Sequence, residues 1–359
     1  MINLAVNIKE QNKNYPIYIN NNDLSELKDT ILNEIEHKNY IVIFSEKVYK
    51  LYSKILDFPK DKIFILKDGE REKNYKNYMK ILNFALTKKL KREDTIIAIG
   101  GGVVGDLAGF VASTYMRGIN FIQVPTTLLA ATDSSVGGKV ALNSDYGKNL
   151  IGAFYQPKAV FINVNFLKTL DEKQYKSGLG EVLKYGFIEK SCNQNDDAQL
   201  INFLSKNYEK ILSKDILTLK QLIKMCIELK IAVVQQDEKE KGLRKILNYG
   251  HTYGHVIETL TKYSKYAHGE AVIEGINFAI KLAYNLNLIE KEYKFLCEDL
   301  IKKFDYKPIK NFDKNKIINT MTTDKKATNE HIKYILPTGY APVEEYDFTP
   351  EELKEMIGA

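Results

Sequence analysis

The sequence predicts an N-terminal α/β domain followed by an all-α C-terminal domain. The chain has 359 residues, and one hydrophobic core rarely grows beyond about 250 to 300 residues, so we expect two domains. Short β-branched and aromatic runs alternate with polar segments in the first half, which is typical of a mostly parallel sheet covered by helices. The second half carries long segments with apolar residues at helical spacing. The change falls near residue 170, which predicts domains 1–170 and 171–359.

Four apolar runs in the first half predict buried strands. They are 41–44 (IVIF), 63–66 (IFIL), 95–99 (TIIAI) and 121–124 (FIQV). The segment 74–90 lies between the second and third runs and has the pattern of a helix. Strands and helices that alternate in this way predict parallel pairing.

The second half predicts helices with little strand between them. The helical segments are 197–212, 214–235, 269–285 and 291–304, and a single strand-like run lies near 331–336. We therefore assign this half to a separate helical domain.

Composition excludes several classes of protein. Lys plus Arg exceed Asp plus Glu by 52 to 46, and this net charge of +6 predicts no nucleic-acid partner. The cysteines Cys192, Cys226 and Cys297 are odd in number and widely spaced, which argues against a disulfide framework and predicts a cytoplasmic protein. The start of the chain does not resemble a signal peptide. The most apolar stretch, 95–142, is interrupted by charges, so we expect no membrane span.

A glycine-rich loop follows the third predicted strand. Gly100, Gly102 and Gly105 form GxGxxG directly after 95–99, and 106–113 can open a helix. Glycines in this context let a backbone approach a pyrophosphate, which predicts a Rossmann-like nucleotide-binding domain. A tight turn without a ligand is the alternative. The loop follows the third strand rather than the first, and the next strand does not end in a ribose-binding acid, so we expect a variant of the usual dinucleotide site.

Charged loops near this motif are further candidates. The turn 69–73 (GEREK) follows the strand 63–66, and loops at the carboxyl ends of parallel strands form ligand sites. The loops 134–139 and 147–150 are small and flexible and contain Lys139 and Lys148. Such loops suit phosphate oxygens, although solvated surface is the alternative for each of them.

Three of the five histidines lie within eighteen residues. His251 and His255 are four residues apart, on one face of a helix, and His268 follows after a turn. A metal needs three or four converging ligands, and with no suitable cysteines a carboxylate such as Glu181 is the expected third partner. The spacing leaves open which of His251 and His255 is the ligand. Histidines that cap or fill a helical domain are the alternative.

Seven blocks of sequence, in order along the chain, resemble the 3-dehydroquinate synthase family of sugar phosphate cyclases. The blocks are 100–119, 124–143, 147–157, 178–186 (GLGEVLKYG), 242–258 (GLRKILNYGHTYGHVIE), 268–276 (HGEAVIEGI) and 321–326 (MTTDKK). The resemblance implies a dehydroquinate synthase-like fold, with an NAD-binding α/β domain and a helical metal-binding domain.

The resemblance also implies roles for individual residues. The implied metal ligands are Glu181, His251 and His268, and His255 is implied in proton transfer. The implied NAD contacts are Glu70, Lys73, Gly101, Gly102, Val103, Asp106, Thr126, Thr127, Lys139 and Lys148. The implied substrate pocket contains Asp133, Lys139, Asn149, Lys184, Lys230, Arg244, Asn248, Lys325 and Lys326, with Arg117 delivered from the other subunit of a homodimer. Ser45 stands where the family often has an acid that holds the adenosine ribose.

The implied activity is conversion of 3-deoxy-D-arabino-heptulosonate 7-phosphate, a sugar-acid phosphate, to 3-dehydroquinate and phosphate. In the family this proceeds by transient oxidation with NAD, β-elimination of phosphate, reduction and intramolecular aldol closure, with zinc, or cobalt, as the metal. A 2-deoxy-scyllo-inosose or valiolone type of cyclase, a glycerol-type dehydrogenase and a non-catalytic sensor are the alternatives. Arg244, Lys230 and the cations at 325–326 favour the dehydroquinate reading because they suit a carboxylate-bearing substrate.

Overall fold

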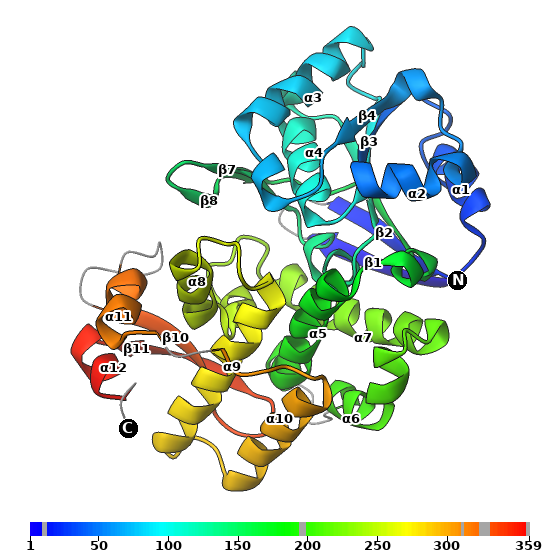
Figure 1. Cartoon of the computed structure of the whole chain (residues 1–359). Coiled ribbons are helices and arrows are strands. Elements are labelled where there is room, and N and C mark those ends of the chain that lie inside the picture. Colours follow the sequence, from blue (N-terminus) through cyan, green and yellow to red (C-terminus); the bar gives the residue numbers. More distant parts are fainter. Residues whose placement is uncertain (9–12, 194–198, 310–311, 323–330, 357–359) are drawn as a thin grey trace. The chain divides into compact units, whose positions relative to one another are not determined.

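The computed structural model describes residues 1–8, 13–193, 199–309, 312–322 and 331–356 (Figure 1). The chain divides into two compact units. The first contains Met1–Asp171 and Ile216–Glu238, and the second contains Glu172–Asp215 and Lys239–Ala359. No helix in the described ranges is long and apolar enough to cross a membrane.

A seven-stranded sheet forms the centre of the first unit, in the order β1-β2-β9-β6-β5-β3-β4. Its strands are β1 (Ile2–Ile8), β2 (Lys13–Asn20), β3 (Tyr40–Ser45), β4 (Ile63–Leu66), β5 (Thr95–Gly100), β6 (Asn120–Pro125) and β9 (Ala159–Asn163). Only β1 and β2 pair antiparallel in this sheet; its other pairs are parallel. The four strands predicted from the apolar runs are confirmed as β3 to β6.

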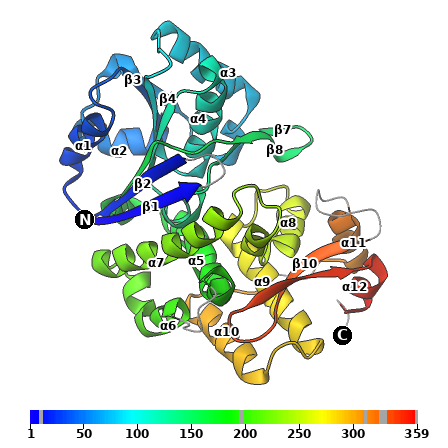
Figure 2. The same ribbon diagram turned by 180° about the vertical axis from the view of Figure 1, so that it is seen from behind.

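Helices cover both faces of this sheet (Figures 1 and 2). They are α1 (Leu27–Glu34) and α2 (Glu46–Leu56) on one face, and α3 (Tyr75–Thr87) and α4 (Gly102–Thr114) on the other. The side chains of β3 show why: Ile41 and Ile43 pack in the core with α3 and α4, whereas Val42 and Phe44 pack in the core with α1 and α2. Alternate residues of a strand point to opposite faces, so a strand buried on both faces is a continuous apolar run.

The chain reverses its direction across the sheet between β3 and β5. From β3 it proceeds outward to β4, and from β5 it proceeds the other way to β6. Ligands of open α/β sheets bind at the carboxyl ends of strands beside such a reversal. The glycine loop that begins at Gly100, the last residue of β5, lies at this position.

A two-stranded antiparallel ribbon, β7 (Lys139–Ser144) and β8 (Gly147–Phe154), projects from the body of the first unit (Figure 1). The helix α7 (Ile216–Gln236) also belongs to this unit and packs against β1 and β2. We expected α7 in the second domain. An apolar helical pattern shows that a helix is buried, but not which sheet or helix covers it.

The second unit is mostly helical. It contains α5 (Glu172–Asn193), α6 (Gln199–Leu212), α8 (His251–Leu260), α9 (His268–Asn285), α10 (Lys291–Lys303), α11 (Lys314–Thr322) and α12 (Pro350–Met356). The strands β10 (Ile332–Pro337) and β11 (Val343–Phe348) form an antiparallel pair. This pair corrects the expectation of an all-α domain. The strand-like run near 331–336 is β10. Its partner β11 was not predicted, because the sequence VEEYDF is rich in acidic residues, which are uncommon in strands.

Candidate functional site

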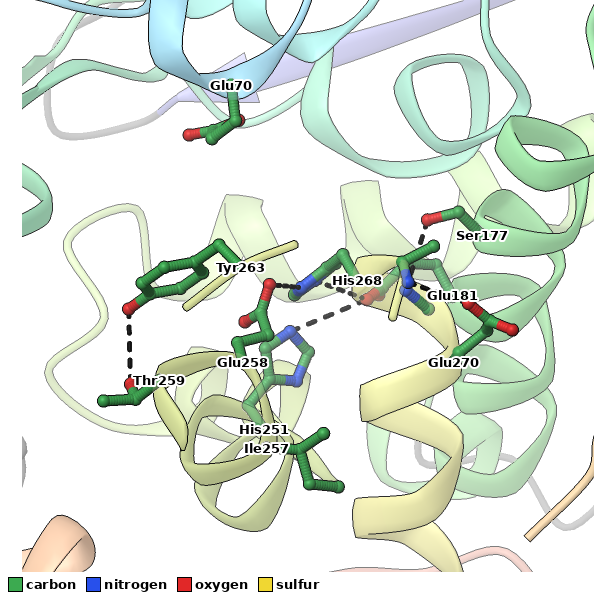
Figure 3. A network of polar contacts seen from close by, with 12 residues as sticks. Glu70, Ser177, Glu181, His251, Ile257, Glu258, Thr259, Tyr263, His268 and Glu270 are labelled. Atoms are coloured by element: carbon green, nitrogen blue, oxygen red, sulfur yellow. Dashed lines mark hydrogen bonds and ion pairs between the residues drawn. The ribbon is translucent and has the colours of Figure 1, made fainter. Parts of the chain in front are cut away.

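A cluster of one carboxylate and two imidazoles lies in the second unit (Figure 3). Glu181 lies on α5, His251 is the first residue of α8, and His268 is the first residue of α9. One ligand atom from each lies within 4.8 Å of the others. Glu181 Oε1 is 3.6 Å from His251 Nε2 and 3.3 Å from His268 Nε2. This donor set, with two nitrogens and one carboxylate, fits a divalent metal such as zinc.

Glycines allow the three helices to approach closely enough for this cluster. A Cβ on Gly180 of α5 would lie 2.5 Å from the carbonyl oxygen of Gly269 on α9. A Cβ on Gly275 of α9 would lie 1.9 Å from the carbonyl oxygen of Gly250, which precedes α8 and has a φ of +77°. Backbone therefore packs against backbone on both sides of α9. These crossings bring the first residues of α8 and α9 to Glu181.

The cluster attracts positive charge. Lys184, one turn after Glu181, forms an ion pair with it, and both side chains are almost fully buried. Burial would lower the pKa of His268, but hydrogen bonds to Glu181 and Glu258 outweigh this effect and raise its pKa to about 10. Burial lowers the pKa of His251 well below its usual value. The carboxylates that raise the pKa of His268 supply negative charge, which would also favour a bound cation.

His255 lies one turn along α8 from His251, with 5.6 Å between the ring centroids. It is outside the three-residue cluster. Arg244 is buried, with 1% of its surface exposed, in the short helical turn Leu243–Asn248. Asn248 ends that turn and donates a hydrogen bond to Glu240. Of the candidates expected in this domain, Lys325 and Lys326 lie outside the described residues.

In the first unit the glycine loop forms the start of α4. Gly101 caps this helix, and the backbone N–H of Thr126 donates to the carbonyl of Gly100. A Cβ on Gly101 would lie 3.0 Å from Thr127 Cγ2, so a side chain would crowd the turn. The first N–H groups of a helix have no acceptor within it, and they carry the positive end of the helix dipole. Gly101, Gly102 and Val103 thus lie at the N-terminus of α4, a position that favours anions in general.

A polar network lies beside this terminus. Lys73, only 3% exposed, forms an ion pair with Asp106 of α4 and donates to Asn149 Oδ1 at 2.5 Å. Burial raises the pKa of Asp106, and the charge of Lys73 opposes that rise. Asn143 donates to Glu70 Oε1 at 2.7 Å, and its side-chain oxygen accepts from the backbone N–H of Asn149 at 3.0 Å. The structure therefore brings together candidates from the charged turn, the glycine loop and the β7–β8 ribbon.

The other candidates of the first unit differ in their partners and in their exposure. Lys230 of α7 pairs with Asp133 at 2.9 Å. Thr126 is buried, Lys139 is exposed and Lys148 is half-buried. Ser45 accepts a hydrogen bond from the backbone N–H of Val48 and caps α2, so it has a local structural role.

Two residues beside the candidates were missed by sequence reasoning. Asn143 bridges Glu70 and Asn149, and Glu258 lies 3.4 Å from His268 Nδ1. Asn143 lies within the block 124–143, so the family resemblance could have identified it as a candidate. Glu258 follows His251 by seven residues on the same helix, which is also readable in the sequence.

Family models describe most of the chain. The model for the 3-dehydroquinate synthase N-terminal region matches residues 63–177, and the model for the C-terminal region of the same family matches residues 178–327. The 3-dehydroquinate synthase of Alkaliphilus metalliredigens is 43% identical over 99% of this chain and 98% of its own length. That of Thermoanaerobacter sp. is 40% identical over 99% of both chains.

Solved structures agree with this fold. A 2-deoxy-scyllo-inosose synthase complexed with carbaglucose-6-phosphate, NAD+ and Co2+ has a TM-score of 0.82 and 25% identity over 99% of both chains. The 2-epi-5-epi-valiolone synthase of Streptomyces hygroscopicus, with NAD+ and Zn2+ bound, has a TM-score of 0.82 at 19% identity, over 96% of this chain and 95% of its own. The predicted dehydroquinate synthase-like fold is confirmed, with a mostly helical second unit in place of the expected all-α domain. The chain belongs to the 3-dehydroquinate synthase family of enzymes.

Proposed function

We propose that this chain converts 3-deoxy-D-arabino-heptulosonate 7-phosphate to 3-dehydroquinate and phosphate. The observation that carries the proposal is the cluster of Glu181, His251 and His268 in a chain 43% identical to a 3-dehydroquinate synthase. The product differs from the substrate by loss of phosphate, with no net oxidation.

Two bound groups are part of the proposal. Glu181, His251 and His268 would hold the divalent metal, with zinc as the first choice and cobalt as the second. The start of α4, with Asp106, Lys73 and Glu70 beside it, would hold NAD. When bound, the metal supplies Lewis acidity toward substrate hydroxyls, and NAD accepts and returns two electrons.

The chain's own residues then have separable tasks. His255 would take the proton of the hydroxyl being oxidised onto a ring nitrogen, because it lies one helical turn from His251 without belonging to the cluster. Lysine and arginine side chains would hold the two anionic ends of the substrate. The candidates for this task are Lys139, Lys184, Lys230 and Arg244, with Asp133, Asn149 and Asn248 as polar neighbours. Among them, Arg244 is nearly inaccessible, so its position is fixed by packing.

The main alternative is a sister cyclase that accepts a sugar phosphate without a carboxylate. The structural similarity to the 2-deoxy-scyllo-inosose synthase is high, but sequence identity to it is 25%, against 43% for the dehydroquinate synthase relative. We therefore favour the carboxylate-bearing substrate.

We also propose a homodimer in the cytoplasm, in which Arg117 serves the site of the other subunit. Arg117 is exposed, and both Met116 and Arg117 have positive φ values, of 49° and 64°. Non-glycine residues adopt this left-handed conformation less readily than glycine does, so the surrounding structure holds the backbone of Arg117 in place.

Phosphate release tests the proposed function. The purified chain should release phosphate from the heptulosonate phosphate when NAD and metal are present, and a chelator should abolish this release. Glucose 6-phosphate, which has no carboxylate, is the control substrate. If the chain released phosphate from glucose 6-phosphate but not from the heptulosonate phosphate, its activity would be that of a sister cyclase.

A further inference from the structure

We propose that Glu258 is a positioning residue that fixes the orientation and tautomer of His268 for metal binding. This inference rests on the proposed metal site, and it concerns a residue that lies outside the three-ligand cluster. Glu258 is on α8, seven residues after His251, so one face of α8 presents both a ligand and this carboxylate.

The geometry places His268 between two carboxylates (Figure 3). Its Nε2 lies 3.3 Å from Glu181 Oε1, and its Nδ1 lies 3.4 Å from Glu258 Oε1. The Glu258 side chain is 6% exposed, so burial restricts its conformations. The two ring nitrogens therefore face different groups, one toward the cluster and one away from it.

Imidazole chemistry explains why the second carboxylate matters. A neutral imidazole has one N–H and one lone pair, and a metal ligand must present its lone pair. If His268 binds through Nε2, its Nδ1 must carry the proton and needs an acceptor. Glu258 provides one, which excludes the other tautomer and holds the ring in the orientation that faces Glu181.

His251 has an equivalent arrangement with a different acceptor. Its Nδ1 lies 3.2 Å from the backbone carbonyl of Tyr249, which leaves Nε2 toward Glu181. Both histidines thus have an acceptor at Nδ1 and face the cluster with Nε2. Only the acceptor of His268 carries a full negative charge, which increases the basicity of the ligand and adds charge to the site.

Metal affinity tests this inference without any substrate. The apo forms of the wild type, Glu258→Gln and Glu258→Ala would be titrated with Zn²⁺ against a chromophoric chelator, and circular dichroism would confirm folding. Loss of such an acceptor typically weakens metal binding by roughly 10- to 100-fold, and we expect that loss in Glu258→Ala. Glu258→Gln keeps an acceptor oxygen without the charge, so we expect a smaller loss. The visible spectrum of the Co²⁺-loaded protein should change in Glu258→Ala because the ligand ring is less restrained.

A matched control is Glu270→Gln. Glu270 also lies close to His268, but its carboxylate accepts the backbone N–H of Ala267. Its loss of charge should change metal affinity less than Glu258→Ala does.

The outcomes separate the two hypotheses. If the wild type binds Zn²⁺ and Glu258→Ala binds it equally well, the role of Glu258 is wrong and the metal site stands. If the wild type binds no metal, the metal site is wrong and the inference is wrong with it. Should Glu258→Ala fail to fold, wild-type affinity and an unchanged Co²⁺ spectrum in Glu258→Gln would overturn the inference.

Discussion

A Cβ atom on Gly269 would lie 1.9 Å from the carbonyl oxygen of Ser177, so α9 crosses α5 without room for any side chain at that point. The backbone N–H of Gly269 also donates to Ser177 Oγ at 3.2 Å. Gly269 follows His268 directly, and Glu181 lies one turn after Ser177. The distance between two proposed metal ligands therefore depends on this crossing.

Gly269→Ala should separate the two helices and weaken the metal site. Overpacking of this kind typically costs about 1–3 kcal/mol of the free energy of unfolding, which urea denaturation would measure. We expect Zn²⁺ affinity to fall in the folded fraction as well. Gly254→Ala is the control, because its Cβ would lie 3.1 Å from the carbonyl oxygen of Ala271 and needs only a small adjustment. Equal metal affinity in both variants would contradict this explanation.

His251→Ala and His255→Ala should differ in metal content. Loss of His251 leaves two ligands, so the variant should lose both metal and activity. Loss of His255 should leave the metal in place while phosphate release slows by about 10²- to 10⁴-fold, as expected for a lost proton-transfer group. Mass spectrometry of the metal content and a phosphate assay measure the two effects. A metal-free His255→Ala protein would show that our division of roles is wrong.

Redox balance distinguishes a cyclase from a dehydrogenase. Because the oxidation is reversed within each turnover, catalytic NAD should support continued phosphate release while absorbance at the NADH wavelength stays constant. A glycerol-type dehydrogenase would instead form NADH in proportion to the substrate consumed. Parallel phosphate and absorbance measurements on one sample decide between them.

Lys73→Met should destabilise the chain more at high pH than at low pH. Lys73 and Asp106 have side chains that are 4% and 19% exposed, and removing one partner of such a pair leaves an uncompensated carboxylate. Burial already raises the pKa of Asp106, and the loss of Lys73 raises it further, so the carboxyl is more often neutral near pH 5.5 than near pH 8. The cost, up to about 3 kcal/mol, should therefore grow as pH rises. Urea denaturation at both pH values tests the sign.

The double variant Lys73→Met/Asp106→Asn provides the control for this experiment. With no carboxylate to ionise, its stability relative to the wild type should vary less between pH 5.5 and pH 8. A pH dependence as large as that of Lys73→Met would assign the effect to other groups.

Complementation tests the proposed role of Arg117 across a dimer. Arg117→Ala and His255→Ala should each be nearly inactive. A mixed dimer would contain one intact site and one doubly defective site, so random reassortment of equal amounts should restore at most about a quarter of wild-type activity. Differently tagged chains allow purification of the mixed dimer. If verified heterodimers show no recovery, Arg117 does not act on the partner's site.

The sequence predicts the centre of the first unit better than its edges. The strands β3, β5 and β6 are buried on both faces, so each is a continuous apolar run. Such a run can be recognised from the local sequence without knowing what packs against it. The first strand, INLAVNI, alternates exposed and buried residues and lies at the sheet edge, where its polar residues hide the pattern. The ribbon strand GKNLIGAF exposes Leu150 and Ile151 and has no buried face to read.

The candidate metal site was predictable because it contains histidines, which are scarce in this chain. Their clustering predicted a metal site with Glu181 as the expected carboxylate, and the family resemblance implied His251 rather than His255 as the ligand. Glu258 is one of 46 acidic residues, and only the packing of α8 against α9 shows which histidine it reaches. The same limit applies to α7, whose local pattern does not identify the sheet that it covers.

The covalent chain passes between its two units three times, after residues 171, 215 and 238. A gene broken once after residue 171 would encode a first fragment without α7, in which β1 has lost the helix that packs on it and Asp133 has lost Lys230. The second fragment would contain α7 without β1 and β2, the strands against which its apolar side chains pack. A single break in the gene therefore cannot transfer either unit intact to another gene.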